Sequence, residues 1–298
     1  MALSTKLIKK RIRSISNTKK ITRAMEMVSA VKMRKSVNAV LASRAYARTA
    51  WEVVLNLAKR VNPEDHPLLT GHGETNKTAI ILISSNRSLC GGFNSQIIAK
   101  VLALAGADDV DYIAIGQKGA EMLARGGKNI VAQFEKPDVI TGAETVKPAI
   151  KMIIADFLTG KYTKVFVAYT DYISALTQKP EVLQLLPFQA LQDSDLGSIG
   201  AKSQNKEESA FDTFEYVFEP NKTEILSQFL PLLIEIQLYQ AMLESAASEH
   251  SARMMAMKNA SSAATDMIAD LTLMFNQARQ AGITREIAEI TGSKAALE

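Results

Sequence analysis

The longest regular pattern in the chain is an apolar seam near its C-terminal end. Residues 222–281 contain no glycine and a single proline, Pro231, which lies close to the start, where the loss of a backbone amide costs least. Steps of alternately four and three residues reach fifteen positions, and all but three of these are apolar: Phe229, Leu233, Ile236, Gln240, Leu243, Ala247, His250, Met254, Met257, Ser261, Ala264, Ile268, Leu271, Phe275 and Ala278. This heptad spacing predicts one long helix in a left-handed coiled coil.

A second long helix is predicted over residues 3–61, because neither glycine nor proline occurs before Pro63. Two runs of apolar residues have the heptad spacing, and a six-residue step that breaks the phase separates them: Ile8, Ile12 and Ile15, then Ile21, Met25 and Val28. The two ends of one chain must return to each other, so we expect an antiparallel pair. The alternative is two separate amphipathic helices packed on an ordinary core.

The pairing register can be predicted by placing apolar residues opposite one another. Ile8 is expected near Leu271 and Met25 near Met254, because each pair then lies on the seam. Residues 275–298 would project beyond the N-terminus as a single helix, which Gly282 or Thr284 could interrupt.

Between the two long helices, short apolar runs alternate with amphipathic segments. Strands are expected at 78–84, 112–115, 129–134, 164–170 and 182–188, and helices at 94–105, 118–125 and 144–158. Pro187 indicates that the last strand lies at an edge. This alternation predicts a small, mostly parallel sheet.

The expected fold class is α/β: a long antiparallel coiled coil of N- and C-terminal helices with an inserted small Rossmann-like α/β domain. The expected domains are an N-terminal coiled-coil helix at 1–61, a central α/β domain at 62–219 and a C-terminal coiled-coil helix at 220–298. Residues 193–209 are polar, and we interpret them as a flexible linker.

Charge is distributed very unevenly along the chain. Residues 1–60 contain fifteen basic and two acidic residues, a net charge of +13, whereas the remainder has a net charge of −9. A basic helix of this strength indicates a nucleic acid, an anionic membrane surface or an acidic protein as partner. No apolar run is long enough to span a bilayer, and the single cysteine, Cys90, excludes an intramolecular disulfide.

The loop at 84–94 is the strongest candidate for a ligand site, because it follows a strand and precedes a helix. It lacks both G-x-G-x-x-G and G-x-x-x-x-G-K, so a tight turn with Cys90 packed as a small apolar residue is the favoured interpretation. The sequence shows no metal-ligand cluster and no Ser/His/Asp grouping. We therefore expect no metal, no cofactor and no catalytic site.

Four segments resemble the gamma subunit of F-type ATP synthase: 21–35 (ITRAMEMVSAVKMRK), 84–94 (SSNRSLCGGFN), 248–258 (SEHSARMMAMK) and 277–290 (QARQAGITREIAEI). They occur in the same order as in that family and extend across essentially the whole chain. The last contains the pattern I-T-x-E-x-x-E. Some positions depart from the family, which usually has Asp and Gly in the loop and Gly-Ala after the last motif: Asn86, Ser88, Gly292, Ser293 and Lys294.

The resemblance implies a central rotor shaft that couples proton flow through a membrane sector to ATP synthesis or hydrolysis in a ring of alpha and beta subunits. It also implies contacts with the epsilon subunit and the c-ring, no nucleic acid, and a peripheral place on the cytoplasmic face of the bacterial plasma membrane. Nucleotides would belong to other subunits. By motif position, it implies coupling or partner contacts for Met25 and Arg253, near the beta subunit, and for Arg279, Gln280, Thr284 and Glu286, at the upper bearing.

Two other classes of protein remain open from the residues alone. One is a nucleic-acid-binding coiled-coil protein that uses the basic first helix, for which salt-dependent DNA binding would be the sign. The other is a small α/β enzyme with helical arms, for which turnover by the chain alone would be the sign.

Overall fold

A computed structural model describes residues 5–58, 66–70, 77–105, 109–140, 142–188 and 222–295, with the side chains of 44–58, 222–223, 226 and 294–295 left out. The chain forms two compact units. The helical unit comprises Met1–Val28 and Met254–Glu298, and the sheet unit comprises Ser29–Arg253. The expected division at 62 and 220 stays a prediction, and the predicted linker at 193–209 lies outside the described residues.

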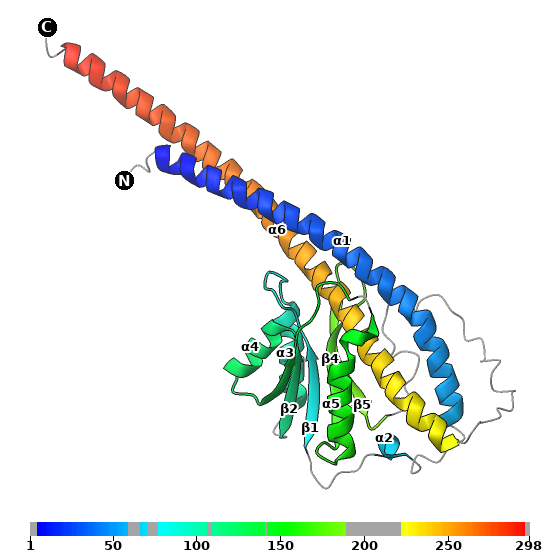
Figure 1. Cartoon of the computed structure of the whole chain (residues 1–298). Coiled ribbons are helices and arrows are strands. Elements are labelled where there is room, and N and C mark those ends of the chain that lie inside the picture. The colour runs from blue at the N-terminus through cyan, green and yellow to red at the C-terminus, as the bar shows by residue number, and fades with distance from the viewer. Residues whose placement is uncertain are drawn as a thin grey trace. The chain divides into compact units, whose positions relative to one another are not determined.

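The two predicted long helices are confirmed. α1 covers Thr5–Ala58 and α6 covers Lys222–Ala295, and each continues from one unit into the other. Inside the sheet unit the two helices are tied together by Ser43, whose Oγ donates to Oε1 of Gln240 at 2.6 Å. In chain order the α/β domain is inserted between them, as the sequence predicted, and Figure 1 shows its strands beside α6.

The sheet has five strands in the order β3-β2-β1-β4-β5. They are β1 (Thr78–Ile83), β2 (Val110–Ile115), β3 (Ile130–Phe134), β4 (Lys164–Tyr172) and β5 (Gln178–Leu186). The first four are parallel, and β5 pairs antiparallel with β4 at the edge. β5 begins four residues before the predicted strand, because this edge segment pairs through its backbone and has no apolar alternation to mark its start.

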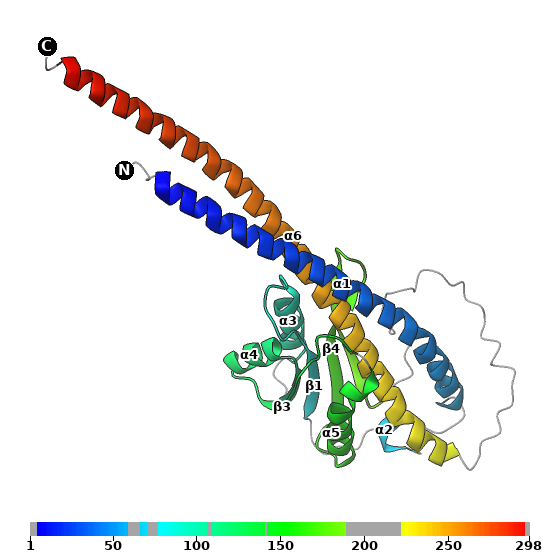
Figure 2. The ribbon, with the colours of Figure 1, turned by 45° about the horizontal axis from the view of Figure 1, so that its top comes forward.

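Helices cover both faces of the sheet (Figure 2). α3 (Phe93–Ala105) and α4 (Gln117–Arg125) pack on one face, and α5 (Lys147–Leu158) and α6 pack on the other. The short helices α2 (Pro67–Thr70) and η2 (Ala143–Thr145) complete the described elements. Each face of the sheet has its own hydrophobic core, and β1 contributes to both. Ile80 and Leu82 point to one face, while Ile81 and Ile83 point to the other. A strand buried on both faces is a continuous apolar run, which is why β1 was predictable.

The topology places the loop after β1 at a switch point. The chain leaves β1 through α3 toward β2 on one side, whereas β4 is reached through α5 on the other. Right-handed crossovers require these two helices to lie on opposite faces. The switch point therefore lies between β1 and β4, and ligands of open α/β sheets usually bind at such a point, outside the carboxyl ends of the strands.

In the helical unit, α1 and α6 lie side by side (Figures 1 and 2). The predicted seam of α6 is buried or half-buried from Met254 to Ala278, and every side chain from Arg279 to Ser293 is exposed. α6 continues through Gly282 and Thr284 without interruption. The hydroxyl of Thr284 donates to the Gln280 carbonyl at 3.0 Å, within the same helix, so it does not begin a new one.

The predicted seam of α1 is right only for its first run. Ile8 is buried and Ile12 and Ile15 are half-buried, but Ile21 and Val28 are 61% and 55% exposed. Steps of four and three continue unbroken from Ile15, and the buried residues that they reach are Thr22, Ser29 and Val40. The phase break expected after Ile15 is therefore absent from α1, because heptad geometry and not hydropathy decides which side chains face inward.

The predicted register of this pair stays a prediction, and the groove between the helices favours a shifted one. The groove between the helices is lined by residues 19–27 of α1 and 258–265 of α6. Because the helices are antiparallel, a register centred on this groove would place Ile8 level with about Phe275, one helical turn beyond Leu271.

Candidate functional site

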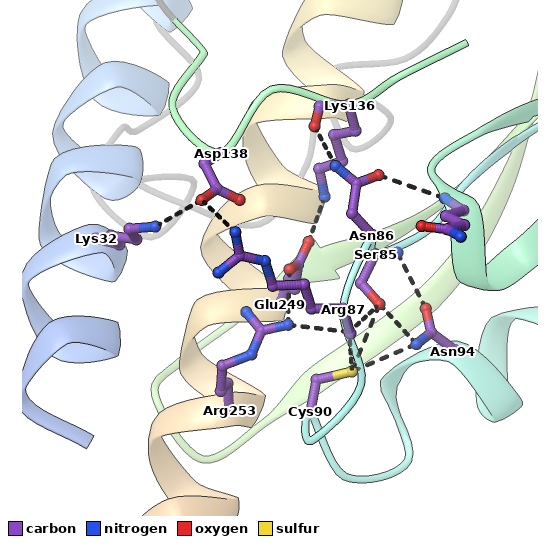
Figure 3. A network of polar contacts seen from close by, with 11 residues as sticks. Lys32, Ser85, Asn86, Arg87, Cys90, Asn94, Lys136, Asp138, Glu249 and Arg253 are labelled. Carbon is purple, nitrogen blue, oxygen red and sulfur yellow. Dashed lines mark hydrogen bonds and ion pairs between the residues drawn. The ribbon is translucent and has the colours of Figure 1, made fainter. Parts of the chain in front are cut away.

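The loop after β1 is held by side chains of its own segment (Figure 3). The Ser85 amide donates to Asn94 Oδ1 at 3.1 Å, and Asn94 Nδ2 donates to Ser85 Oγ at 2.7 Å. Ser85 Oγ in turn donates to the Arg87 carbonyl at 2.8 Å. Cys90 is buried, as predicted, and its sulfur lies 3.4 Å from Asn94 Nδ2. The polar groups that could face a phosphate therefore bind one another, which favours the tight-turn interpretation.

Asn86 joins the loops that follow β1, β2 and β3. Its Nδ2 donates to the Lys136 carbonyl, and its Oδ1 accepts the amide of Gln117 at 3.3 Å. An ionised aspartate could accept but not donate, so the asparagine suits this place between a donor and an acceptor.

A buried ionic group connects these loops to α6 (Figure 3). Lys136 Nζ lies 2.7 Å from Glu249 Oε2, and Arg253 Nη2 lies 2.9 Å from Glu249 Oε1. All three residues are less than a tenth exposed. Burial alone would raise the pKa of Glu249, but the Lys136 ammonium and the Arg253 guanidinium outweigh it and hold that pKa below its usual value. We call Lys136, Glu249 and Arg253 the ionic joint.

The ionic joint extends to the loop and to α1. Arg253 Nη2 also donates to the Arg87 carbonyl at 3.2 Å, whereas the Arg87 side chain is largely exposed. Asp138 Oδ2 accepts from Lys32 Nζ of α1 at 3.0 Å and lies 3.9 Å from Arg87 Nη2. The hydrogen bond from Lys32 is the main reason that the pKa of Asp138 is lowered, against the opposing effect of burial.

His250 lies beside the ionic joint and is 4% exposed. Its Nδ1 is buried without a hydrogen-bond partner. Burial lowers its pKa to about 4, although the neighbouring Glu249 carboxylate acts in the opposite direction. The imidazole is therefore neutral at physiological pH.

A groove of about 330 Å³ lies in the helical unit. Its lining includes the cations Lys19, Arg23 and Lys258, one acid, Glu26, and the hydroxyl of Thr265. Such a surface attracts an acidic partner, because three cations face it against one carboxylate.

The predicted site residues fall into different places. Arg253 belongs to the ionic joint of the sheet unit, whereas Met25 is half-buried in the helical unit. Four others lie together on the exposed end of α6: Arg279, Gln280, Thr284 and Glu286. The structure therefore brings these four onto one helical stretch.

Sequence reasoning missed Lys136, Glu249 and Asp138. The spacing of Glu249 and Arg253 on one helix was a usable signal, since residues four apart are neighbours on a helix surface. Lys136 had none, because its partner lies 113 residues away.

Nowhere in the ranges that the structure describes do three His, Cys, Asp or Glu side chains gather as a metal-binding group. No helix there combines the length and the apolar character that crossing a bilayer requires.

Comparison with solved structures defines the class of protein. The chain is similar to one in the rotor of Euglena gracilis mitochondrial ATP synthase, with a TM-score of 0.63 at 16% identity, covering 94% of this chain and 99% of that one. The chain therefore shares the fold of that chain, with long paired helices and an inserted α/β domain.

Comparison of sequences identifies the family. The family described as ATP synthase matches residues 4–297. The ATP synthase gamma chain of Pelotomaculum thermopropionicum is 39% identical over 98% of both chains. That of Chloroflexus aurantiacus is 38% identical over 99% of both chains. The chain belongs to the ATP synthase gamma chain family.

Proposed function

We propose that the chain is the central rotor shaft of an F-type ATP synthase, coupling proton flow through the membrane sector to ATP synthesis or hydrolysis in the alpha–beta ring. Besides family membership, one observation carries the proposal. Beyond Ala278, α6 continues without cover from α1, yet it exposes Ile283, Ile287 and Ile290. A helix with such an apolar stripe needs a surrounding surface, and the apex of a subunit ring supplies one.

The proposed partners are the alpha and beta subunits, the epsilon subunit and the c-ring. The cations that line the groove support contact with an acidic segment of the ring. Met25 lies on the same stretch of α1, and we propose it as a residue of that contact. Arg253 is proposed to influence coupling near the beta subunit. The exposed Arg279, Gln280, Thr284 and Glu286 are proposed as contacts with the upper bearing. Nothing in the comparisons supports the nucleic-acid alternative.

The chain is a subunit of an ATPase complex, and we propose that it has no catalytic site of its own. In support, Ser85 and Asn94 of the loop after β1 bind each other, and the Ser85 hydroxyl also binds the Arg87 carbonyl. The complex is membrane-bound, and the proposed place of this chain is its peripheral, cytoplasmic side at the bacterial plasma membrane.

Co-expression with alpha and beta subunits tests the proposal. We expect a coupled ATPase complex only when this chain is present, and no hydrolysis by the purified chain alone. Turnover by the chain without beta subunit, or full rotary activity of a complex that lacks it, would contradict the proposal.

A further inference from the structure

We propose that the ionic joint fixes the rotational position of the α/β domain on α6, and that Lys136 and Glu249 are positioning residues for the coupling of proton transport to ATP turnover. This inference rests on the function proposed above. It concerns how torque is transmitted, within the sheet unit, between the sheet and residues 222–253 of α6.

The argument begins with the other contacts between α6 and the sheet. Along the preceding turns, α6 packs on the sheet through apolar side chains such as Leu233, Leu238 and Met242. Apolar contacts are non-directional, so they hold a helix against a sheet without strongly fixing its rotation about its own axis. Torque about that axis is the load that a rotating shaft must transmit.

The ionic joint supplies directional contacts, which can fix the rotation of α6 about its axis. Glu249 uses both carboxylate oxygens, one toward Lys136 Nζ at 2.7 Å and the other toward Arg253 Nη2 at 2.9 Å. A buried carboxylate with both oxygens engaged tolerates little rotation, because loss of either partner leaves a desolvated charge unpaired. Lys136 follows β3 and is tied through its carbonyl to Asn86, so the anchor on the sheet side is itself fixed.

A second contact grips the same turn of α6 from the β4–β5 hairpin. Ser251 Oγ donates to the Ala175 carbonyl at 2.7 Å, and Gln178 Nε2 lies 3.5 Å from the same hydroxyl. Ser251 is two residues from Glu249, so the two side chains leave the helix on roughly opposite sides. The turn at 249–253 is therefore held from two directions.

Arg253 has a defined place in this arrangement. Its guanidinium is almost wholly buried between the Glu249 carboxylate and the Arg87 carbonyl. Because this guanidinium is buried and paired, we expect Arg253 to influence a partner subunit chiefly through the loop after β1, which it holds at the Arg87 carbonyl. Substitutions of Lys136 or Glu249 should therefore affect coupling in the same way as the effect proposed for Arg253.

The test uses the complete complex in membrane vesicles and compares ATP-driven proton pumping with ATP hydrolysis. Lys136→Met and Glu249→Gln should each lower the ratio of pumping to hydrolysis by about threefold or more, within the range for coupled buried pairs. Lys136→Arg, which retains the charge, should restore the wild-type ratio. Lys128→Met, at an exposed position, is the matched control and should change nothing.

The double variant Lys136→Met with Glu249→Gln separates positioning from stability. It removes the Lys136–Glu249 pair and leaves one buried charge, the Arg253 guanidinium, which retains its hydrogen bond to the Arg87 carbonyl. Glu249→Gln alone leaves two buried cations without their carboxylate, so the complex with the double variant should assemble even if the Glu249→Gln variant does not. A lowered ratio in the assembled double variant supports the joint. A wild-type ratio there, or a Lys136→Arg variant as uncoupled as Lys136→Met, overturns it. If the unaltered chain gives no coupled pumping, the proposed function fails instead.

Discussion

Gly116 and Ser84 approach so closely that a side chain on Gly116 would collide with the end of β1. A β-carbon there would lie 2.5 Å from the Ser84 carbonyl oxygen and 2.8 Å from its hydroxyl. Gly116 also has a φ of 104°, which side chains disfavour. The contact sets the start of α4 directly against the end of β1, so no side chain fits between them at this point.

Gly116→Ala should reduce the free energy of unfolding by about 2–4 kcal/mol, because it adds a backbone collision to an unfavourable φ. Gly127→Ala is the matched control: its φ is 66°, and its β-carbon would meet nothing within 4 Å. It should cost roughly 1 kcal/mol. Urea unfolding followed by circular dichroism measures both, and equal losses would show that the collision is relieved by local movement.

His250 should make stability depend on pH in the acidic range. Its folded pKa of about 4 lies below the ordinary 6.5, so the unfolded chain takes up the proton first as pH falls. Stability should therefore fall from about pH 6.5 and stop responding to this group near pH 4. Relative to His250→Gln, the wild type should lose roughly 2–3 kcal/mol between pH 7.5 and 4.5. Parallel stability curves for the two proteins would contradict the assignment. The loss due to Glu249 belongs to lower pH, because its pKa is lowered from 4.5.

The register of the helical unit can be checked by cross-linking. On a Cys90→Ala background, cysteines at positions 8 and 275 should form a disulfide readily, whereas cysteines at 8 and 271 should do so poorly. The reason is distance, since one turn of helix displaces a side chain by about 5.4 Å, beyond disulfide reach. Faster oxidation of the 8–271 pair would restore the register predicted from the apolar pattern.

Charge reversal in the groove tests its proposed partner chemistry. Arg23→Glu together with Lys258→Glu should weaken association with the alpha–beta ring by about tenfold at low salt, with a smaller effect at high salt. The control, Lys128→Glu with Lys164→Glu, makes the same change in net charge at exposed positions of the sheet unit. Equal weakening by both pairs would show that only net charge matters. The association rate at two salt concentrations is the measurement.

The exposed isoleucines of α6 should contribute to the thermal stability of the complex but not to the folding stability of the isolated chain. Ile287 is 57% exposed, so Ile287→Ser should change the free energy of unfolding by less than about 0.5 kcal/mol. In the complex it should lower the temperature at which rotary activity is lost, because the proposed bearing loses an apolar contact. Arg285→Ser serves as the control on the same stretch. A complex that is indifferent to Ile287→Ser would show that this stripe has no covering surface.

The elements that the sequence predicted well are those whose burial is continuous or periodic. β1 is apolar at nearly every position because both of its faces are covered, and the α6 seam repeats over many turns. Thr22 was missed because a small polar side chain in the seam has no hydropathy signal, while its neighbour Ile21 has a strong one. The edge strand β5 was only partly found, since its first half, Gln178 to Glu181, is polar.

The candidate site was less predictable than the fold. The motif positions identified Arg253, but its contacts depend on Glu249, Lys136 and the Arg87 carbonyl. Lys136 and Arg87 lie in the loops after β3 and β1, which the topology brings together at the carboxyl ends of the strands. The spacing of these residues along the sequence does not indicate that the two loops are close.

Rotation observed directly in single complexes tests the central claim. A bead attached to a cysteine at position 128, on a Cys90→Ala background and with the alpha–beta ring fixed to a surface, should turn in one direction while ATP is supplied and stop when it is removed. Undirected motion of the bead during ATP hydrolysis at the wild-type rate would contradict the assignment of this chain as the rotor shaft.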